Sequence, residues 1–503
     1  MSHYHTPLDL VRSRPVEGPV ACARPDRLTI AASWFQNNFP GEVLYAVKSN
    51  PSAWVIDTLY AAGMRWFDVA SLNEVELIAS RCPDATMAFM HPVKSRRAIN
   101  KAYFDYGVRI FVLDCEAELE KILVETGYAK DLTLVVRIAV SNDGATLPLA
   151  GKFGASEDDA VELIQRARVY ADELGVSFHV GSQCMAPSAY RGAMLDVSRL
   201  IKRAAVTVDI VDVGGGFPVA YPGMTPPPLS EYVAAIENAF EEMMVLENAD
   251  LWCEPGRALC AESTSILTRV ELVKGDQVYL NDGAYGTLFD LVHMKWPYPI
   301  RVHRAKGEPS GQTAGFRLYG PTCDAIDAVS APVELPVDLS EGDVIEFAML
   351  GAYGVAMATR FNGFGEVETE MVSDFPWASV YDRPVADQPA AAAEDDGLIV
   401  DDGGAVTAGG GSPALGARAV AARAVEGAAE GRVGRERRTR RAAHLYVQRI
   451  NAVCFEPNRP QPFSCAAALV CREYYGHARR NFWRFAAGEA VSNPRSGEKP
   501  AGR

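Results

Sequence analysis

The chain has 503 residues, of which 48% are hydrophobic and 9% aromatic, so it can hold two or three domains with a packed core and is not disordered throughout. Its formal net charge is −15, yet residues 401–503 carry 17 Lys and Arg against 9 Asp and Glu. The remaining body is therefore strongly acidic, which argues against a nucleic-acid partner or an anionic membrane surface and suits a cationic substrate.

The start of the chain has no apolar core segment, and no run of about 18 apolar residues follows, so the sequence predicts neither export nor a membrane span. The ten cysteines are scattered without CxxC or Cys/His ligand spacing. This pattern favours reduced thiols in a cytoplasmic protein over a disulfide framework, and it predicts no metal site.

From residue 43, eight short apolar runs are each followed by a stretch with helical patterning, the alternation expected of βα units. Near-continuous apolar runs are typical of parallel strands buried on both faces, so we predict a (β/α)8 barrel over residues 25–261. The runs cover residues 43–49, 65–71, 86–92, 109–115, 134–140, 176–182, 209–216 and 250–257.

Polar side chains gather at the C-terminal ends of these runs, where the mouth of a (β/α)8 barrel lies. Taken alone, Lys48 in YAVKSNP is most simply the first polar residue after a strand. A ring of polar groups at eight strand ends favours a functional site instead. Its members are Lys48, Asp68, His91, Asp114, Arg137, His179, Gly214, Gly215, Gly216, Glu254 and Arg257.

After residue 262 the pattern changes to closely spaced strand-like runs with turns at Gly275, Gly320 and Gly342, which predicts an all-β domain over residues 262–384. Residues 1–24 are expected to add a strand to that domain through GPVACARP. Residues 385–503 are rich in Ala, Gly and Arg without a sustained apolar period, so we expect a disordered tail.

The groups at the strand ends are those that pyridoxal 5'-phosphate (PLP) requires. Lys48 offers an amine for a Schiff base, and the glycines of DVGGGFP let backbone N–H groups approach a phosphate. His179 of FHVGSQ can stack on a ring, and Glu254 of EPGR can keep a heterocyclic nitrogen protonated. Each feature also has a plainer explanation: a glycine turn, a structural histidine, or a buried ion pair between Glu254 and Arg257.

Eleven motifs, taken together, resemble the ornithine/lysine/arginine decarboxylases of the alanine-racemase-like fold (type III), most closely the compact bacterial ornithine decarboxylases. The resemblance runs from about residue 17 to 365 and implies a PLP-dependent decarboxylation, with L-ornithine giving putrescine and CO2 in polyamine biosynthesis. The motifs are YAVKSNP, FDVAS followed by Glu74, FMHPVKS, VVRIA, KFGA, FHVGSQ, DVGGGFP, EPGR, NDGAYG, GPTCDAID and GAYGVAMATRFNGF.

The resemblance also implies roles for individual residues. Lys48 would bind the cofactor covalently, His179 would stack on its ring and Glu254 would pair with its pyridine nitrogen. Asp68, Glu74 and Arg137 match residues that line the site near the lysine. The residues expected around the phosphate are Ser182, Gly214, Gly215, Gly216, Arg257 and Tyr353.

In this family the active site is completed across the interface of a homodimer. The resemblance implies that Cys323 comes from the partner subunit as the acid that protonates the substrate carbon, and that Asp324 holds the distal ammonium of the substrate. Lys152 and Asp327 match an ion pair between subunits. Without the family, Cys323 would be interpreted as a core thiol.

One segment departs from the family. Many relatives have a tyrosine-aspartate pair followed by histidine after NDGxYG, and the aspartate gives the distal amine a second carboxylate. Here the sequence reads GTLFDLVHMKWPYP, and Asp290 lies too close to the motif to be assigned that role. The preference for ornithine over lysine therefore rests on overall similarity.

Three other functions remain to be weighed. A diaminopimelate decarboxylase usually has Cys-Glu-Ser where this chain has Cys323-Asp324-Ala325, and a racemase of this fold would need a catalytic tyrosine that CDAID does not supply. A non-catalytic homologue that acts as a regulatory binding protein would be expected to have lost cofactor residues, and Lys48 and Glu254 are both present.

Overall fold

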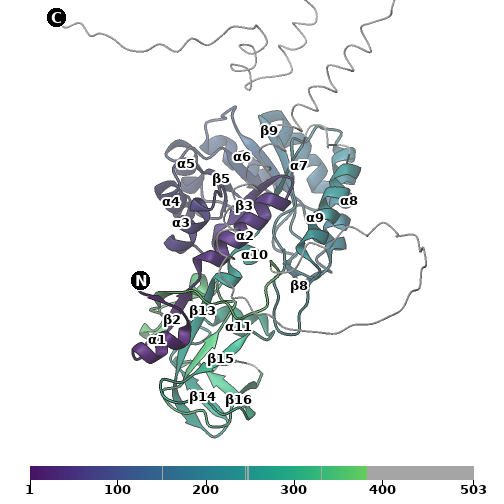
Figure 1. The fold of residues 1–503 in the computed structure, drawn as a ribbon. Coiled ribbons are helices and arrows are strands. Elements are labelled where there is room, and N and C mark those ends of the chain that lie inside the picture. The colour runs from purple at the N-terminus through teal and green to yellow at the C-terminus, as the bar shows by residue number, and fades with distance from the viewer. Residues whose placement is uncertain (150, 244, 246–248, 330, 382–503) are drawn as a thin grey trace, which may run out of the picture. The chain divides into compact units, whose positions relative to one another are not determined.

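Eight parallel strands close into a barrel in the computed structural model (Figure 1). The structure describes residues 1–381 except 150, 244, 246–248 and 330, so the expectation for residues 385–503 lies outside the described residues. Around the barrel the strand order is β11-β12-β3-β4-β5-β6-β7-β9. These strands are β3 (Glu42–Ala46), β4 (Trp66–Val69), β5 (Thr86–Phe89), β6 (Ile110–Leu113), β7 (Thr133–Arg137), β9 (Glu173–Ser177), β11 (Ile210–Asp212) and β12 (Asp250–Cys253).

Helices cover the outside of the barrel (Figure 1). Helix α7 has three acidic residues in its first turn, where the helix dipole favours negative charge, and α8 begins at a proline, which suits the first helical position. The helices are α2 (Pro25–Asn38), α3 (Ala53–Ala61), α4 (Leu72–Arg81), α5 (Arg96–Phe104), α6 (Glu116–Glu125), α7 (Glu157–Tyr170), α8 (Pro187–Ala204), α9 (Leu229–Glu242) and α10 (Arg257–Cys260).

The strands bury both faces, as the near-continuous apolar runs predict. In β3, Leu44 belongs to a cluster of buried residues from alternate strand positions, whereas Tyr45 belongs to the larger cluster shared with the helices. Successive side chains of a strand point to opposite faces, so Leu44 faces the barrel interior and Tyr45 the surrounding layer. The predicted fold of a (β/α)8 barrel followed by an all-β region is confirmed.

A second sheet forms the β-domain, which also contains the N-terminal strands. Strand β2 pairs antiparallel with β13 and parallel with β19. The helices α1 (Pro7–Ser13) and α11 (Phe289–Met294) accompany this sheet. Its strands are β1 (His3–Tyr4), β2 (Val20–Ala23), β13 (Thr264–Lys274), β14 (Gln277–Leu280), β15 (Ile300–His303), β16 (Thr313–Tyr319), β17 (Val333–Pro336), β18 (Val344–Phe347) and β19 (Glu368–Val372).

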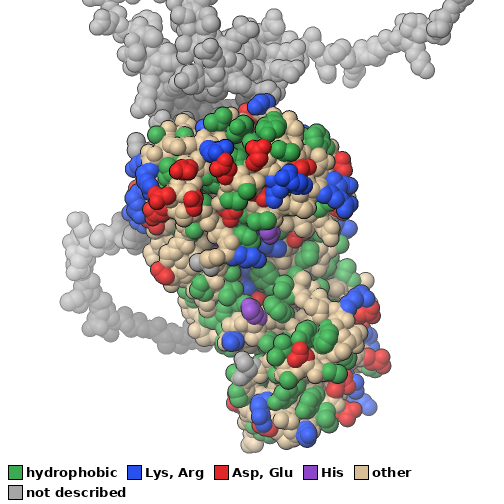
Figure 2. Space-filling model, turned by 180° about the vertical axis from the view of Figure 1, so that it is seen from behind, with side chains coloured by type: hydrophobic (Ala, Val, Ile, Leu, Met, Phe, Trp, Pro, Cys, Tyr) green, Lys and Arg blue, Asp and Glu red, His purple; other side chains and the backbone are tan. Residues whose placement is uncertain are grey.

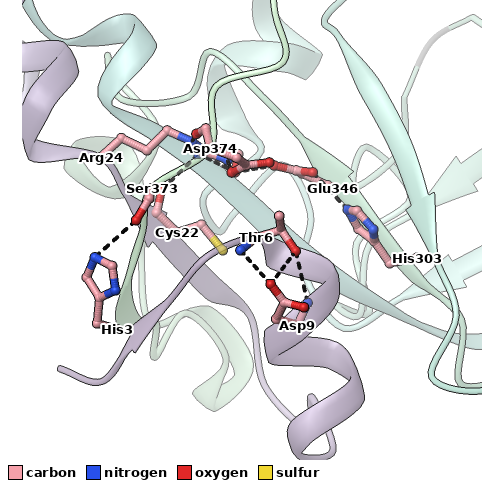
Figure 3. Close-up of polar contacts among 10 residues, drawn as sticks. His3, Thr6, Asp9, Cys22, Arg24, His303, Glu346, Ser373 and Asp374 are labelled. Carbon is pink, nitrogen blue, oxygen red and sulfur yellow. Dashed lines mark hydrogen bonds and ion pairs between the residues drawn. The ribbon is translucent and has the colours of Figure 1, made fainter. Parts of the chain in front are cut away.

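A buried ionic network connects five segments of the β-domain (Figure 3). Arg24, which follows β2, donates hydrogen bonds of 3.1 Å to both Glu346 and Asp374 and one of 2.8 Å to Ser265. His303 lies 2.8 Å from the other oxygen of Glu346. Burial disfavours a charge on Glu346, but the hydrogen bond from His303 and the charge of Arg24 outweigh it and hold the pKa of Glu346 below its usual value. The network therefore joins β2, β13, β15 and β18 through one ionised carboxylate.

One pair of short strands was not expected. The sixth predicted run covers residues 176–182, but β9 ends at Ser177, and Ser182 begins a separate strand, β10 (Ser182–Cys184). Strand β10 pairs antiparallel with β8 (Ala145–Leu147). The chain turns between the two strands at Gly181, whose φ of 96° is open to glycine and strained for other residues. No helix within the described residues is long and apolar enough to cross a membrane.

Candidate active site

The amine of Lys48 lies beside a buried carboxylate at the mouth of the barrel. Strand β3 ends at Ala46, and a single 3-10 turn, Val47–Ser49, carries Lys48 away from the strand. Its Nζ donates a 2.7 Å hydrogen bond to Oδ2 of Asp68 on the adjacent strand β4. Burial opposes the charge on the amine, but Asp68 and Glu254 outweigh it and raise the pKa of Lys48 above its usual value. These two carboxylates therefore favour the protonated amine.

Three glycines after β11 form a cradle without side chains. A Cβ atom on Gly214 would lie 2.2 Å from the carbonyl oxygen of Phe178, and one on Gly216 would lie 2.4 Å from that of Gly181. Gly214 and Gly216 also have positive φ angles of 67° and 106°. Only glycine fits at these two positions, so no side chain covers the backbone at this turn. The N–H of Gly214 donates to Asp212, which leaves the N–H groups of Gly215 and Gly216 without an acceptor among the described residues.

His179 lies over this cradle as a neutral ring. A Cβ on Gly215 would meet its Nε2 at 3.2 Å, and its Nδ1 accepts a 3.0 Å hydrogen bond from the N–H of Gly181. That bond places the ring proton on Nε2. Burial, together with the charges of Arg137 and Lys48, lowers the pKa of His179 to about 3. The imidazole is consequently uncharged at neutral pH.

Two buried carboxyl groups, Asp212 and Glu254, lie next to the cradle. Oδ1 of Asp212 accepts a 2.8 Å hydrogen bond from Gly214, whereas Oδ2 of Asp212 and Oε1 of Glu254 have no donor among the described residues. Burial raises the pKa of both groups, and the charge of Asp212 raises that of Glu254 further. A buried carboxyl oxygen without a donor is uncommon, and a ligand that carries an N–H group would satisfy it.

Arg257, the first residue of α10, is held by partners from three directions. Its Nη1 donates to Oδ2 of Asp290 at 2.6 Å and to the hydroxyl of Tyr221 at 2.9 Å, and its Nη2 donates to Oδ1 of Asp290 at 3.2 Å. Its Nε lies 3.4 Å from Oγ of Ser182, which can accept its proton. An ion pair between Glu254 and Arg257 was the plainer explanation of EPGR, but Arg257 forms its ion pair with Asp290 instead.

Tyr353 brings the β-domain to the turn that carries Lys48. Its backbone N–H donates a 2.8 Å hydrogen bond to the carbonyl of Ser49, and the amide of Asn50 donates one of the same length to the carbonyl of Gly351. The guanidinium of Arg257 lies 5.0 Å from the centre of the Tyr353 ring. Tyr353 has a φ of 58°, an unfavourable left-handed conformation for a tyrosine that these contacts hold in place.

The other two residues predicted near the lysine come from different elements of the barrel. Glu74, in the first turn of α4, accepts a 2.6 Å hydrogen bond from the N–H of Ala70, and burial raises its pKa. Arg137 ends β7 and lies 5.8 Å from the ring of Phe153. The structure thus gathers the predicted barrel residues at one mouth.

Cys323 and Asp324 lie in the β-domain, in the loop after β16. Cys323 is exposed and Asp324 is half-buried, and both form their hydrogen bonds within that domain. Asp324 accepts a 2.6 Å hydrogen bond from the hydroxyl of Tyr285, which lowers the pKa of Asp324, and the N–H of Cys323 donates to Asn362. Among the described residues, no contact joins Cys323 or Asp324 to Lys48 of the same chain. The predicted pair between Lys152 and Asp327 of different subunits stays a prediction, and Asp327 accepts hydrogen bonds from its own chain.

Three residues of the site were not foreseen. Asp212 could have been recognised from DVGGGFP, because it lies two residues before the glycine cradle at the end of a buried strand. Tyr221 and Tyr298, which both bind partners in the Arg257 cluster, come from loops whose sequences give no such signal.

A (β/α)8 barrel with an amine, a glycine cradle and buried carboxyl groups at its mouth is typical of a cofactor-dependent enzyme. The sequence model of the pyridoxal-binding domain of pyridoxal-dependent decarboxylases matches residues 27–261. The lysine/ornithine decarboxylase of Selenomonas ruminantium is 32% identical over 72% of this chain and 92% of its own length. Antizyme inhibitor 2 of Xenopus laevis is 33% identical over 64% of this chain and 73% of its own length.

Among solved structures, the arginine decarboxylase of Paramecium bursaria Chlorella virus bound to agmatine superposes with a TM-score of 0.65 at 26% identity, covering 72% of this chain and 98% of that one. The chain belongs to the PLP-dependent decarboxylases of fold type III. The residues at the mouth fit PLP, because Lys48 offers an amine, the glycine cradle carries no side chain that would exclude a phosphate, and the buried Oε1 of Glu254 has no donor among the described residues and would accept a ring N–H.

Proposed function

We propose that the protein decarboxylates a basic amino acid, with L-ornithine as the preferred substrate and putrescine and CO2 as products. The observation that carries the proposal is the arrangement at one barrel mouth of the Lys48 amine, the glycine cradle and the unsatisfied carboxyl of Glu254. These are the groups that the chemistry of a PLP decarboxylase needs.

Bound PLP supplies an electron sink for the carbanion that loss of CO2 creates. In our proposal Lys48 holds it covalently, and Asp68 orients the amine. Glu254 keeps the ring nitrogen protonated, and neutral His179 packs against the ring without adding a charge. The phosphate is bound by Ser182, Gly214, Gly215, Gly216, Arg257 and Tyr353, and Arg137 lies near the lysine.

We assign the distal ammonium of the substrate to Asp324. Its carboxylate is ionised, since the hydroxyl of Tyr285 lowers its pKa, and it is fixed in direction by that hydrogen bond. Asp290 does not supply the second carboxylate that many relatives use, because both its oxygens are bound to Arg257. One carboxylate in this role suits a single distal ammonium, as in ornithine or lysine, and disfavours diaminopimelate, which carries a distal carboxylate.

We propose a homodimer in which Cys323 and Asp324 of one subunit complete the site of the other. Cys323 then protonates the substrate carbon. Exposed apolar side chains near these residues support the proposal: Ile326 is 69% exposed and Phe361 43%, and the rings of Phe361 and Tyr285 lie 4.8 Å apart. Figure 2 shows hydrophobic side chains gathered on the β-domain, where a partner would cover them.

The experiment that tests the function is CO2 release from ornithine, lysine, arginine and diaminopimelate by the purified protein with added PLP. We expect turnover of ornithine, slower turnover of lysine and little of the other two. A higher kcat/KM for lysine than for ornithine would show that lysine is the preferred substrate.

A regulatory binding protein is the second candidate, because one relative carries the name of an inhibitor. The presence of Lys48, His179 and Glu254 at one barrel mouth supports the enzyme instead. A protein that showed no visible absorbance with PLP and released no CO2 from any of the four amino acids would decide for the binding protein.

A further inference from the structure

Asp290 has no role in the function proposed above, yet it lies at the centre of a buried cluster. Its side chain is 3% exposed, and it accepts two hydrogen bonds from Arg257, whose side chain is 4% exposed. The hydroxyl of Tyr298 donates to the same carboxylate. Asp290 belongs to α11, between β14 and β15 of the β-domain, whereas Arg257 begins α10 of the barrel.

The partners of Arg257 occupy most, but not all, of the N–H groups of its guanidinium. A guanidinium carries five N–H groups, and four of them have acceptors here: two in Asp290, one in Tyr221 and one in Ser182. One N–H of Nη2 has no acceptor among the described residues, and the contact of Nε with Ser182 is long at 3.4 Å. These are the groups that an incoming anion can take without breaking the pair with Asp290.

The rings around Arg257 do not set its direction by themselves. Its guanidinium carbon lies 5.0 Å from the centre of Tyr353 and 5.5 Å from that of Trp296, contacts that attract a cation without selecting which N–H points where. A bidentate carboxylate does fix the directions of the N–H groups, because the planar guanidinium pairs with it in one orientation.

We propose that Asp290 is a positioning residue that fixes the guanidinium of Arg257 for the phosphate of PLP. This inference rests on the proposed assignment of Arg257 to the phosphate. In this proposal the aspartate after NDGAYG would act on the phosphate through Arg257, instead of giving the distal amine of the substrate a second carboxylate.

Two effects of the carboxylate oppose each other, so the sign of the outcome is informative. Its negative charge repels a phosphate dianion, which predicts tighter PLP binding when Asp290 is removed. Its orientation of the fork predicts weaker binding when it is removed, since Arg257 must then pay the entropy of being ordered by the ligand. The positioning role requires that the second effect is larger.

The experiment measures the dissociation constants of PLP and of pyridoxal, which lacks the phosphate, for the cofactor-free protein. For Asp290→Ala we expect the constant for PLP to rise on the order of tenfold or more and that for pyridoxal to change less than about twofold. Asp290→Asn, which keeps one acceptor oxygen, should fall between the wild type and Asp290→Ala. If Asp290→Ala does not fold, Asp290→Asn and Tyr298→Phe must still weaken PLP binding selectively.

Asp343→Asn is the matched control. Asp343 holds Arg304 through two hydrogen bonds of 2.8 Å within the β-domain, away from the residues assigned to the cofactor. This variant should lower the melting temperature and leave both dissociation constants unchanged. A control that weakened PLP binding as much as Asp290→Asn would reduce the effect at Asp290 to general destabilisation and overturn the proposal.

Arg257→Gln separates this inference from the proposed function. If Arg257→Gln lowers the preference for PLP over pyridoxal, the assignment of Arg257 to the phosphate stands. If the Asp290 variants then leave that preference unchanged, or bind PLP more tightly, Asp290 has no positioning role. If Arg257→Gln leaves the preference unchanged, the assignment of Arg257 to the phosphate is wrong, and the positioning role with it.

Discussion

Lys48 is the residue whose loss has the simplest consequence. Lys48→Ala removes the amine that lies 2.7 Å from Asp68, so the protein should bind PLP without the visible absorbance of a lysine-bound cofactor. Turnover should fall by orders of magnitude. Absorbance spectra of the purified variant and CO2 release check both expectations. Lys101→Ala, on the outer helix α5, should behave as the wild type, and a Lys48→Ala protein that still bound PLP covalently would show that another lysine carries it.

His179 links the site to the acid stability of the fold. Its pKa is about 3 in the folded protein and near 6.5 in an unfolded chain, so below pH 6.5 the unfolded state takes up a proton that the folded state refuses. Stability should therefore be lost as pH falls from 6.5 toward 3, by at most about 1.4 kcal/mol per pH unit from this residue, and should be unaffected by it above pH 6.5.

Urea unfolding of the cofactor-free protein at pH 7.5, 6 and 5 measures this dependence. His179→Asn should flatten the decline, whereas His5→Asn, at an exposed position, should leave it as it is. Equal slopes in the wild type and His179→Asn would mean that the imidazole is readily protonated in the folded state.

For single residues, the sequence predicts their position at the end of a strand better than it predicts their binding partners. Lys48 and Glu254 could be placed at the mouth because a parallel barrel brings all C-terminal strand ends to one side. The partner of Arg257 could not be predicted, since Asp290 lies 33 residues further along the chain in another domain, and no local pattern records a tertiary ion pair.

Among the elements, the strands of the β-domain depend on the network around Glu346 (Figure 3). Glu346→Gln leaves Arg24 buried with one ionised partner fewer and should lower the free energy of unfolding by about 3 kcal/mol. Chemical denaturation measures the loss. The exposed pair between Arg317 and Asp276 offers a control, and Arg317→Gln should cost less than about 1 kcal/mol. A similar loss in both variants would show that burial of the network adds nothing.

The predictability of an element follows from how its apolar residues are arranged. The eight barrel strands stand out because both their faces are buried, so their runs are continuous. Their ends are less certain, as the run at 176–182 shows, where one apolar stretch includes the end of β9, a glycine turn and the start of β10. Strands β15, β17 and β19 give no such run, because four or five residues with mixed burial form too short a pattern.

On the scale of the whole molecule, the proposed dimer predicts complementation between two defective proteins. Lys48→Ala and Cys323→Ala subunits should each be weakly active. After random subunit exchange half of the dimers are mixed, and half of their sites contain an intact lysine and an intact cysteine, so about one quarter of wild-type activity should return.

The measurement is CO2 release after exchange, with native mass spectrometry to verify that mixed dimers have formed. Activity that stays at the level of the parents despite exchange would place Cys323 and Lys48 of one chain in the same site.

Two hydrogen bonds join the backbone of the β-domain to the segment that carries Lys48. The N–H of Tyr353 donates to the carbonyl of Ser49, and the side-chain amide of Asn50 donates to the carbonyl of Gly351. The visible absorbance of a bound cofactor would therefore depend on whether the β-domain is attached to the barrel. During gentle denaturation, loss of those two hydrogen bonds should change the visible spectrum before the helices of the barrel lose their ellipticity. The cofactor would then serve as a built-in optical reporter of domain separation, available without any added label.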